Sequence, residues 1–273
     1  MTLRQMNLSD LKMVLGWAKD EGWNPGLDDA AAFHAADPNG FFLSELNGQP
    51  AAAISVVNHD DNHAFLGLYI CRPEFRGQGH GLALWHAALA HAGTRSVSLD
   101  GVPDQQANYA KSGFVATGGT TRYRGFAPAT PDVARPAQPA DLPALIAADA
   151  RSAGHTRSGF TTAWFHNTET RQTVIHRENP TAFATFRQCG DGLKIGPFNA
   201  PDAHTARALL GAAPNRWATG PIYIDVPAQS PRLAALLESL NFAPSFHTAR
   251  MVKGQPPLAQ PPEFYAVATL ELG

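Results

Sequence analysis

Residues Ile70–Leu84 read ICRPEFRGQGHGLAL, and this stretch decides how the N-terminal half of the chain folds. It follows a continuous apolar run over 65–70 that is suited to a buried central strand. A turn with a proline comes next, and a helical stretch with an apolar stripe begins at Leu82. Three alternate glycines therefore lie between a strand and a helix. They are Gly77, Gly79 and Gly81.

These glycines predict an anion cradle built from the backbone. Glycine lacks a Cβ atom, so backbone N–H groups can converge and an anion can come close. The helix N-terminus adds partial positive charge. The spacing fits neither the G-x-G-x-x-G dinucleotide fingerprint nor the Gly-Lys-Ser/Thr of a nucleoside-triphosphate loop. The residues alone leave open a diphosphate cradle or an ordinary tight turn.

Composition excludes several classes of protein. With 44% hydrophobic residues, the chain of 273 residues can build a core, which excludes wholesale disorder. A net charge of -2 argues against a nucleic-acid partner. No apolar run approaches the ~20 residues of a membrane span, and the N-terminus lacks a signal-sequence pattern. Two distant cysteines favour a reduced, cytoplasmic protein without a disulfide framework.

The chain reads as two copies of one unit. Residues 4–11 (RQMNLSDL) and 135–142 (RPAQPADL) share Arg, Asp and Leu in the same register. An apolar stripe follows the first of these, with Ser9 as a candidate N-cap; the first three of its positions recur in the second copy. The stripe consists of Leu11, Val14, Leu15 and Ala18.

A second pair of matches lies near the end of each half. SLDGVP at 98–103 resembles YIDVP at 223–227, and YAKSGF resembles LESLNF. Arg122 and Arg250 each lie eight residues beyond the phenylalanine that ends these last two words. Several matches keep their order and nearly constant offset, which favours a duplication over chance similarity among short apolar words.

The predicted boundaries are a first unit over 1–127, a Pro/Ala linker over 128–139 and a second unit over 140–273. Repeated prolines should keep the linker extended. The final stretch, 264–272 (FYAVATLEL), is apolar on both faces, so we expect a strand inserted into a sheet.

The stretch 70–84 resembles the acyl-CoA signature of the GNAT acetyltransferase superfamily, R/Q-x-x-G-x-G/A, which is met by Arg76, Gly79 and Gly81. The family's second landmark, a Tyr before a Gly-Phe pair, is matched by YAKSGF from Tyr109. The resemblance covers roughly 2–126; the second half resembles the superfamily in outline only. It implies an α/β (α+β) fold of two GNAT-like units, each a mixed, mainly antiparallel twisted sheet with flanking helices.

The resemblance also implies where acetyl-CoA lies. The cradle would hold the diphosphate, and the strand backbone would hold the pantetheine arm and polarise the thioester carbonyl. The implied cofactor-binding residues are Ile70, Cys71, Arg76, Gly77, Gln78, Gly79, His80 and Gly81. Attack is expected to be direct, because a Cys in this place is more often a small buried hydrophobe than a nucleophile.

Tyr109 matches the general acid of the family. A phenol with an ordinary pKa of ~10 suits proton donation to a thiolate leaving group; the alternative is a core aromatic in an amphipathic helix. The base is less defined, since the central strand carries no acid and Val102 stands where the family often has Asn. Asp100 is the candidate base. Asp225 holds the matching place in the second half, which favours a turn or capping role, and a water chain ending at a carboxylate serves equally.

The second half lacks the cradle, and Pro201 and Asp202 precede its corresponding helix. We expect this unit to lack acyl-CoA binding, to wall one side of the acceptor cleft and to lend strands to the first unit. Aromatic residues also gather in the N-terminal quarter, the region that covers the acceptor in this superfamily; core packing explains them equally well. They are Trp17, Trp23, Phe33, Phe41 and Phe42.

His59 and His63 have metal-ligand spacing for a helix, but they lie between two strand-like runs, so we expect a hairpin loop and no metal. The predicted activity is acetyl transfer from acetyl-CoA to a primary amine, of a small molecule or a peptide, in a ternary complex. Alternatives are a longer acyl-CoA donor and a non-catalytic acyl-CoA sensor or protein-interaction module. A monomer is favoured over a dimer, because a tandem chain can supply internally the contacts that single units gain by dimerising.

Overall fold

The computed structural model describes residues 1–130, 133–213 and 220–273 of the chain. The first half contains β1 (Thr2–Gln5), α1 (Leu8–Asp20), α2 (Asp29–Ala36), β2 (Phe41–Leu46), β3 (Gln49–Asn58), β4 (His63–Cys71), α3 (His80–His91), β5 (Ser96–Gly101), α4 (Gln106–Lys111) and β6 (Val115–Gly125). The second half contains β7 (Ala134–Pro136), α5 (Leu142–Ala153), α6 (Ser158–Trp164), β8 (Arg171–His176), β9 (Phe183–Gln188), β10 (Leu193–Ala200), α7 (Ala203–Ala212), β11 (Ile222–Pro227), α8 (Pro231–Ser239), β12 (Ala243–Lys253) and β13 (Phe264–Ala266). Short 3-10 turns lie at Pro73–Phe75, Pro103–Gln105 and Pro139–Asp141.

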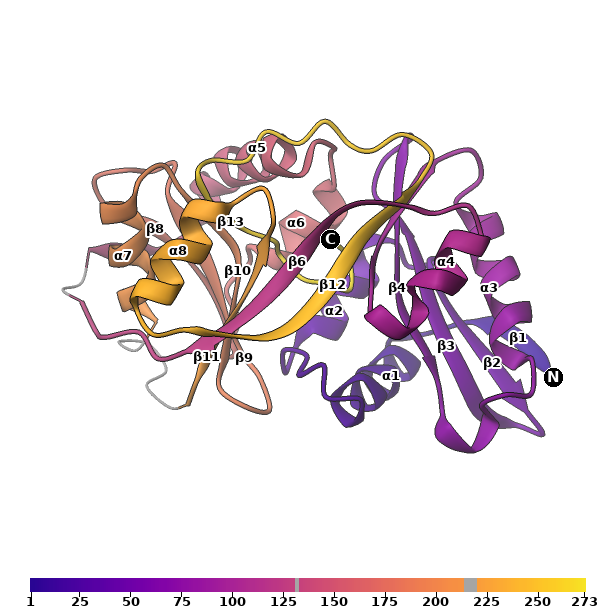
Figure 1. Ribbon diagram of the computed structural model, residues 1–273. Coiled ribbons are helices and arrows are strands. Elements are labelled where there is room, and N and C mark those ends of the chain that lie inside the picture. Colours follow the sequence, from indigo (N-terminus) through magenta and orange to yellow (C-terminus); the bar gives the residue numbers. More distant parts are fainter. Residues whose placement is uncertain (131–132, 214–219) are drawn as a thin grey trace.

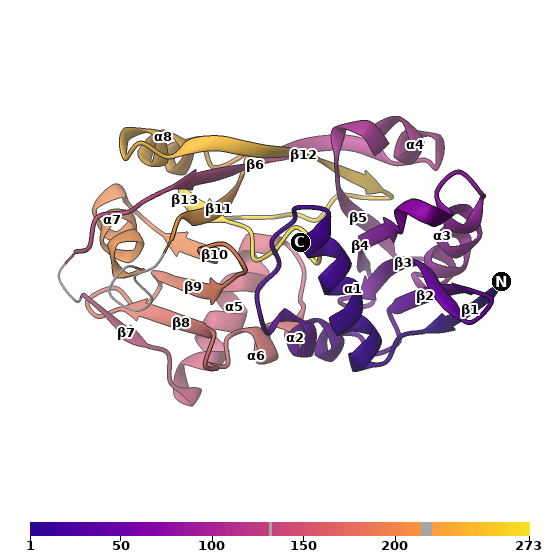
Figure 2. The same cartoon turned by 90° about the horizontal axis from the view of Figure 1, so that it is seen from below.

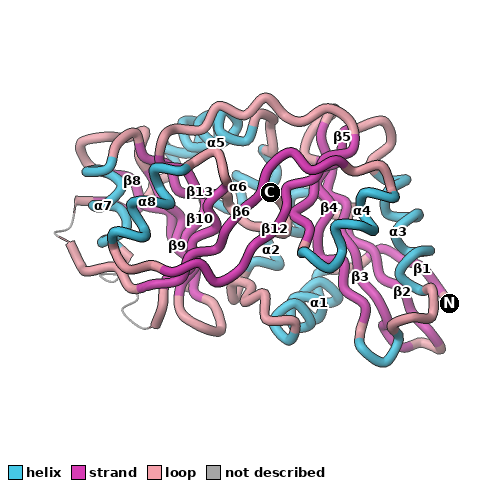
Figure 3. The backbone as a smooth tube through the Cα atoms, viewed as in Figure 1, coloured by secondary structure: helices cyan, strands magenta, loops and turns pink. Residues whose placement is uncertain are grey.

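The two halves repeat the same order of elements, as β1 to β6 and as β7 to β12. Their strands join in one twisted sheet that runs through both lobes, with helices around it (Figures 1 and 3). The strand order is β1-β2-β3-β4-β5-β12-β6-β11-β10-β9-β8-β7. Most neighbours are antiparallel, whereas β4–β5 and β10–β11 are parallel. This confirms the predicted fold class; β7 lies within the stretch expected as an extended linker.

The long strands β6 and β12 are exchanged between the halves and cross the molecule side by side (Figure 2). β12, from the second half, lies between β5 and β6, and β6 pairs on its other edge with β11. Each exchanged strand forms an ion pair with a buried carboxylate: Arg250 contacts Asp100 at 2.8 Å, and Arg122 contacts Asp225 at 2.7 Å. The repeated Asp and Arg of the sequence therefore meet across the exchange, not within one copy.

The start of each half explains the first repeated words. The predicted stripe on α1 is buried. The N-cap, however, is Asn7 and not Ser9: Asn7 accepts from the Asp10 amide, and Asp10 accepts from the Asn7 amide, so two free N–H groups are satisfied. The Asp10 carboxylate also binds the Arg4 guanidinium through two hydrogen bonds. This pairing ties the first strand to the first helix.

The second half repeats the arrangement. Asp141 accepts from the Gln138 amide and forms two hydrogen bonds with the Arg135 guanidinium. The partly exposed Arg135 lowers the pKa of Asp141 to about 2. Arg and Asp thus recur in the sequence because the same local geometry needs both.

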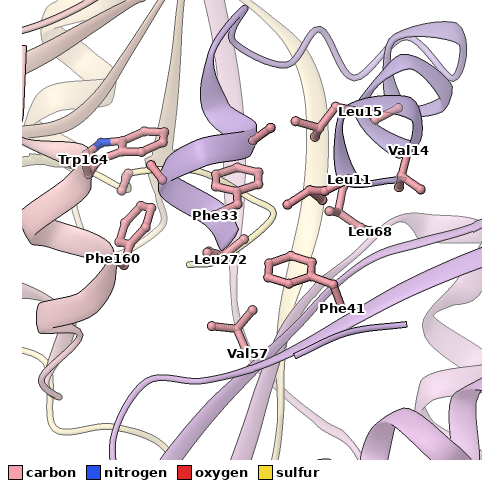
Figure 4. Close-up of a cluster of buried hydrophobic side chains, with 14 of the residues drawn as sticks. Leu11, Val14, Leu15, Phe33, Phe41, Val57, Leu68, Phe160, Trp164 and Leu272 are labelled. Carbon is pink, nitrogen blue, oxygen red and sulfur yellow. The ribbon is translucent and has the colours of Figure 1, made fainter. Parts of the chain in front are cut away.

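A shared core joins the two lobes (Figure 4). Phe33 of α2 stacks on Trp164 of α6, with ring centroids 6.0 Å apart, and Phe160 packs 4.8 Å from the same indole. Phe41 and Leu11 continue this cluster into the first half. Burial of each large apolar side chain stabilises the fold by ~1.5–3 kcal/mol. Neither lobe would keep this surface covered alone.

The C-terminal segment runs between the lobes and is buried almost throughout. Only Phe264–Ala266 of the predicted 264–272 strand forms a strand, which pairs with β10. The pairing of β13 with β10 ends at Ala266, because the chain then crosses toward the first half. On its way it contacts Gly196 of β10 and Gly67 of β4, where an added Cβ atom would collide with its carbonyl groups.

Candidate active site

β4 parts from β5 at the centre of the first half. The two strands pair from His63↔Ser96 to Leu66↔Leu99, and no described residue continues the strand pairing along the rest of β4 on this side. An irregularity interrupts the β3 pairing at the same level, and Leu68 there has a φ of 47°. A leucine in the left-handed region costs ~1–2 kcal/mol. Such strain is often stored at functional sites, and no sequence signal pointed to it.

The predicted glycine cradle adjoins this opening. Gly77 and Gly79 have φ values of 74° and 80°, and apart from their chain neighbours no atom of the described residues would lie within 4 Å of a Cβ atom added to either. α3 begins at His80, so its first backbone N–H groups lack intrahelical acceptors. Gly81 differs, because an added Cβ atom would collide with the hydroxyl of Tyr69. The absence of a side chain at Gly81 therefore serves packing.

The side chains of Arg76 and Gln78 link the cradle to the end of β4 and to the turn that follows it. The Arg76 guanidinium donates to the Cys71 carbonyl at 2.8 Å and contacts Glu21, and half of this side chain is exposed. The Gln78 side chain donates to the Glu74 carbonyl at 3.1 Å. Burial raises the pKa of the Cys71 thiol, which lowers its thiolate fraction and disfavours a nucleophilic role.

Tyr109 of α4 lies beside the point where β4 and β5 part, which is called the apex of the opening. It lines a cavity of about 80 Å³ together with Leu66–Tyr69 of β4 and Leu99 of β5. Its ring stacks on Trp85 of α3, with centroids 5.5 Å apart. Burial, and then the nearby Tyr69, raise the pKa of Tyr109 to about 12. The phenol therefore keeps its proton at neutral pH, as a proton donor must.

Two larger cavities adjoin this small one, and Trp23 lines all three. The first, about 450 Å³, runs along Ile70 and Cys71 to Arg76. The second, about 520 Å³, is lined by both halves, including Arg122 and Phe246. Trp23 thus lies at the junction, whereas Phe33 and Phe41 belong to the core. The second half walls one side of this cleft.

Asp100 also lines the small cavity, but its carboxylate is fully buried and accepts two hydrogen bonds from Arg250, at 2.9 and 2.8 Å. Burial raises the pKa of Asp100, and Arg250 opposes that shift. Asp225 makes the same kind of pair with Arg122. These contacts explain both acids structurally, and a base role for Asp100 stays a prediction.

The corresponding cleft of the second half is filled. β10 and β11 pair over Leu193–Ile195 and Ile222–Ile224, and beyond them β13 pairs with β10. The Val267 amide then donates to the Asp225 carbonyl of β11 at 3.1 Å. α7 carries its own anionic cap, since the Asp202 carboxylate accepts from the Thr205 amide at 2.8 Å. The positions that a pantetheine arm and a phosphate would take are occupied by this chain.

His59 lies in the β3–β4 hairpin loop, as the sequence indicated, whereas His63 is already the first residue of β4. Their rings lie 5.3 and 5.1 Å from that of His155, which the sequence did not predict. Within the described ranges, no group of three or more His, Cys, Asp or Glu side chains could hold a metal ion. Nor does any helix in those ranges have the length and apolar character to cross a bilayer.

Comparison with known proteins defines the class of this chain. The model of the acetyltransferase (GNAT) family matches residues 8–114, and that of the acetyltransferase (GNAT) domain matches residues 145–266. The holothin acyltransferase of Pseudoalteromonas sp. (strain SANK 73390) is 32% identical over 277 residues, which cover 100% of this chain and 94% of that protein. The chain belongs to the GNAT acyltransferases, in their tandem form.

Solved structures agree with this fold. An acetyltransferase-family protein of Pyrococcus horikoshii superposes with a TM-score of 0.83 at 16% identity, covering 100% of this chain and 95% of the other. A tandem GNAT protein from the clavulanic acid biosynthesis pathway gives a TM-score of 0.63 at 13% identity, with 93% and 99% covered. Membership of the GNAT family implies an acyl-CoA donor.

Proposed function

We propose that this chain transfers an acetyl group from acetyl-CoA to a primary amine in a ternary complex, using one site in its first half. The observation that carries the proposal is the parting of β4 from β5 after Leu66, directly beside an open glycine cradle. A GNAT acyl-CoA needs both features: a slot for the arm and backbone donors for the diphosphate.

The residues divide the work as follows. Backbone N–H groups near Gly77–Gly81 hold the diphosphate, and the free edge of β4 at Ile70 and Cys71 holds the arm. A backbone N–H of β4 polarises the thioester carbonyl. Tyr109 donates its proton to the departing thiolate, and the nitrogen of the product restores that proton.

Cavity size supports a short acyl group. The space beside Tyr109 is about 80 Å³, which suits an acetyl group better than a long chain. The adjoining cavity of about 520 Å³, lined by both halves, offers a route for the acceptor. Full-length similarity to the holothin acyltransferase makes holothin the first amine to assay. A peptide amine is the alternative.

A non-catalytic acyl-CoA sensor is the rival function. It would use the same cradle and would bind acetyl-CoA without turnover on any amine. The buried Tyr109 at the apex favours the enzyme. β13 fills the corresponding cleft of the second half, which favours one acyl-CoA site per chain. The exchange of β6 and β12 within the chain favours a monomer. A cytoplasmic location stays a prediction.

Calorimetric titration with acetyl-CoA tests the site. We expect one equivalent to bind, and Gly79→Glu to abolish binding because a carboxylate would face the diphosphate. Gly48→Glu is the matched control: Gly48 also has positive φ (75°) and open space around its Cα atom, but it lies in the β2–β3 turn. Equal affinity in wild type and Gly79→Glu, or two equivalents bound, would contradict the proposal. Thiol release with holothin and simple amines then separates the enzyme from the sensor.

A further inference from the structure

β4 contains no acidic residue, but the C-terminal segment (residues 264–273) places Glu271 beside this strand. The Glu271 carbonyl packs directly on Gly67, where any side chain would collide with it. Gly67 follows Leu66, the last residue of β4 that pairs with β5. The C-terminal residues of the second half therefore cover β4 at the point where the strands part.

The Glu271 side chain differs from the other buried acids. Asp29, Asp149, Asp225 and Asp100 each form an ion pair with an arginine. Glu271 is 5% exposed, and its Oε2 accepts a hydrogen bond from Thr269. Among the residues that the structure describes, Glu271 forms no ion pair, and its Oε1 receives no protein donor.

Cations at longer range still keep Glu271 charged. Burial alone would raise the pKa of Glu271, yet the net shift is downward. The lowering comes from Lys194, from the hydrogen bond of the Thr269 hydroxyl, and from Arg187 and Arg122. Lys194 directs its ammonium to the Trp23 carbonyl, at 2.8 Å. Glu271 is thus an ionised residue on the wall of the small cavity that Tyr109 also lines, and no cation of the described residues forms an ion pair with it. A buried charge of this kind is stabilised by a cationic ligand.

We propose that Glu271 binds the ammonium group of the acceptor and holds its nitrogen at the acyl carbon. The acceptor is accordingly a cationic primary amine. This inference rests on the proposed function, because it needs the thioester at the apex beside Tyr109. The ammonium releases one proton to solvent before the C–N bond forms and the C–S bond breaks. Its second proton restores the Tyr109 phenol that protonated the thiolate.

Two CoA thioethers test the proposal without any known acceptor. S-(2-aminoethyl)-CoA places an ammonium just beyond the sulfur, and S-propyl-CoA is its neutral isostere. In wild type we expect the ammonium compound to bind about ten- to hundredfold more tightly, as for a charge-assisted hydrogen bond. Glu271→Gln should abolish this preference, Glu271→Asp should retain part of it, and the affinity for S-propyl-CoA should stay unchanged as a control of folding.

The outcomes separate the two proposals. Failure of both thioethers to bind wild type would contradict the acyl-CoA site itself. Equal binding of both to wild type, or a preference that survives Glu271→Gln, would overturn the role of Glu271 and leave the acyl-CoA site standing. An equal loss of affinity for both compounds in Glu271→Gln would show a structural role and would also overturn it. For turnover, ethylamine and the neutral isostere methoxyamine form a matched pair: Glu271→Gln should raise KM for ethylamine alone.

Discussion

The exchanged strands predict a specific pattern of stability. Asp225→Asn leaves Arg122 without its charge partner, and both side chains of this pair are 7% exposed or less. Removal of one partner from a buried pair costs ~3–5 kcal/mol. Asp100→Asn does the same to Arg250, whose side chain is 26% exposed, so solvent compensates in part and we expect the lower end of this range. At about 2 °C per kcal/mol for a chain of this size, Tm should fall by about 6–10 °C for Asp225→Asn and about 6 °C for Asp100→Asn.

Scanning calorimetry measures both variants, and a third tests the cause. Asp225→Leu combined with Arg122→Met removes both charges, and the pair model expects it to recover most of the lost stability. A loss below about 1 kcal/mol in both single variants would refute the expectation that these two ion pairs stabilise the folded chain. Turnover of Asp100→Asn below its unfolding temperature separately tests the predicted base: a large loss at unchanged acetyl-CoA affinity would support it.

Two further predictions concern Tyr109 and the buried histidines. Tyr109→Phe should cut turnover by ~10²–10⁴ with little change in acetyl-CoA affinity, because only the proton donor is lost; full activity in a thiol-release assay would remove Tyr109 as the acid. Burial, with Arg157 and His63 adding repulsion, lowers the pKa of His155 to about 4 from its ordinary 6.5. Between pH 6.5 and about 4, His155 is therefore protonated in the unfolded chain and neutral in the folded chain. The free energy of unfolding should fall by about 3 kcal/mol as the pH drops through this range. Urea unfolding of wild type and His155→Gln would show it, and the same pH slope in both would contradict the assignment.

Local signals in the sequence were sufficient for much of the first half. The glycines sit between a strand and α3 because local backbone geometry demands them, and two of the three face open space. Tyr109 lies in a short helix after β5, as the order of motifs indicated. Arg4 and Asp10 recur as Arg135 and Asp141 because each Arg–Asp pair ties a strand to the helix that follows it. Such contacts span few residues, so a short window of sequence contains both partners.

Long-range contacts decided the rest. No window of sequence shows that β12 enters between β5 and β6, that Asp100 meets Arg250, or that His155 joins His59 and His63. The strained Leu68 depends on its neighbours in three dimensions, since nothing in the residue itself favours positive φ. Glu271 looked like the end of a regular strand, and only the fold brings it onto Gly67 beside the apex. Chain-distant groups meet through burial of a shared core, and that burial depends on the whole chain at once.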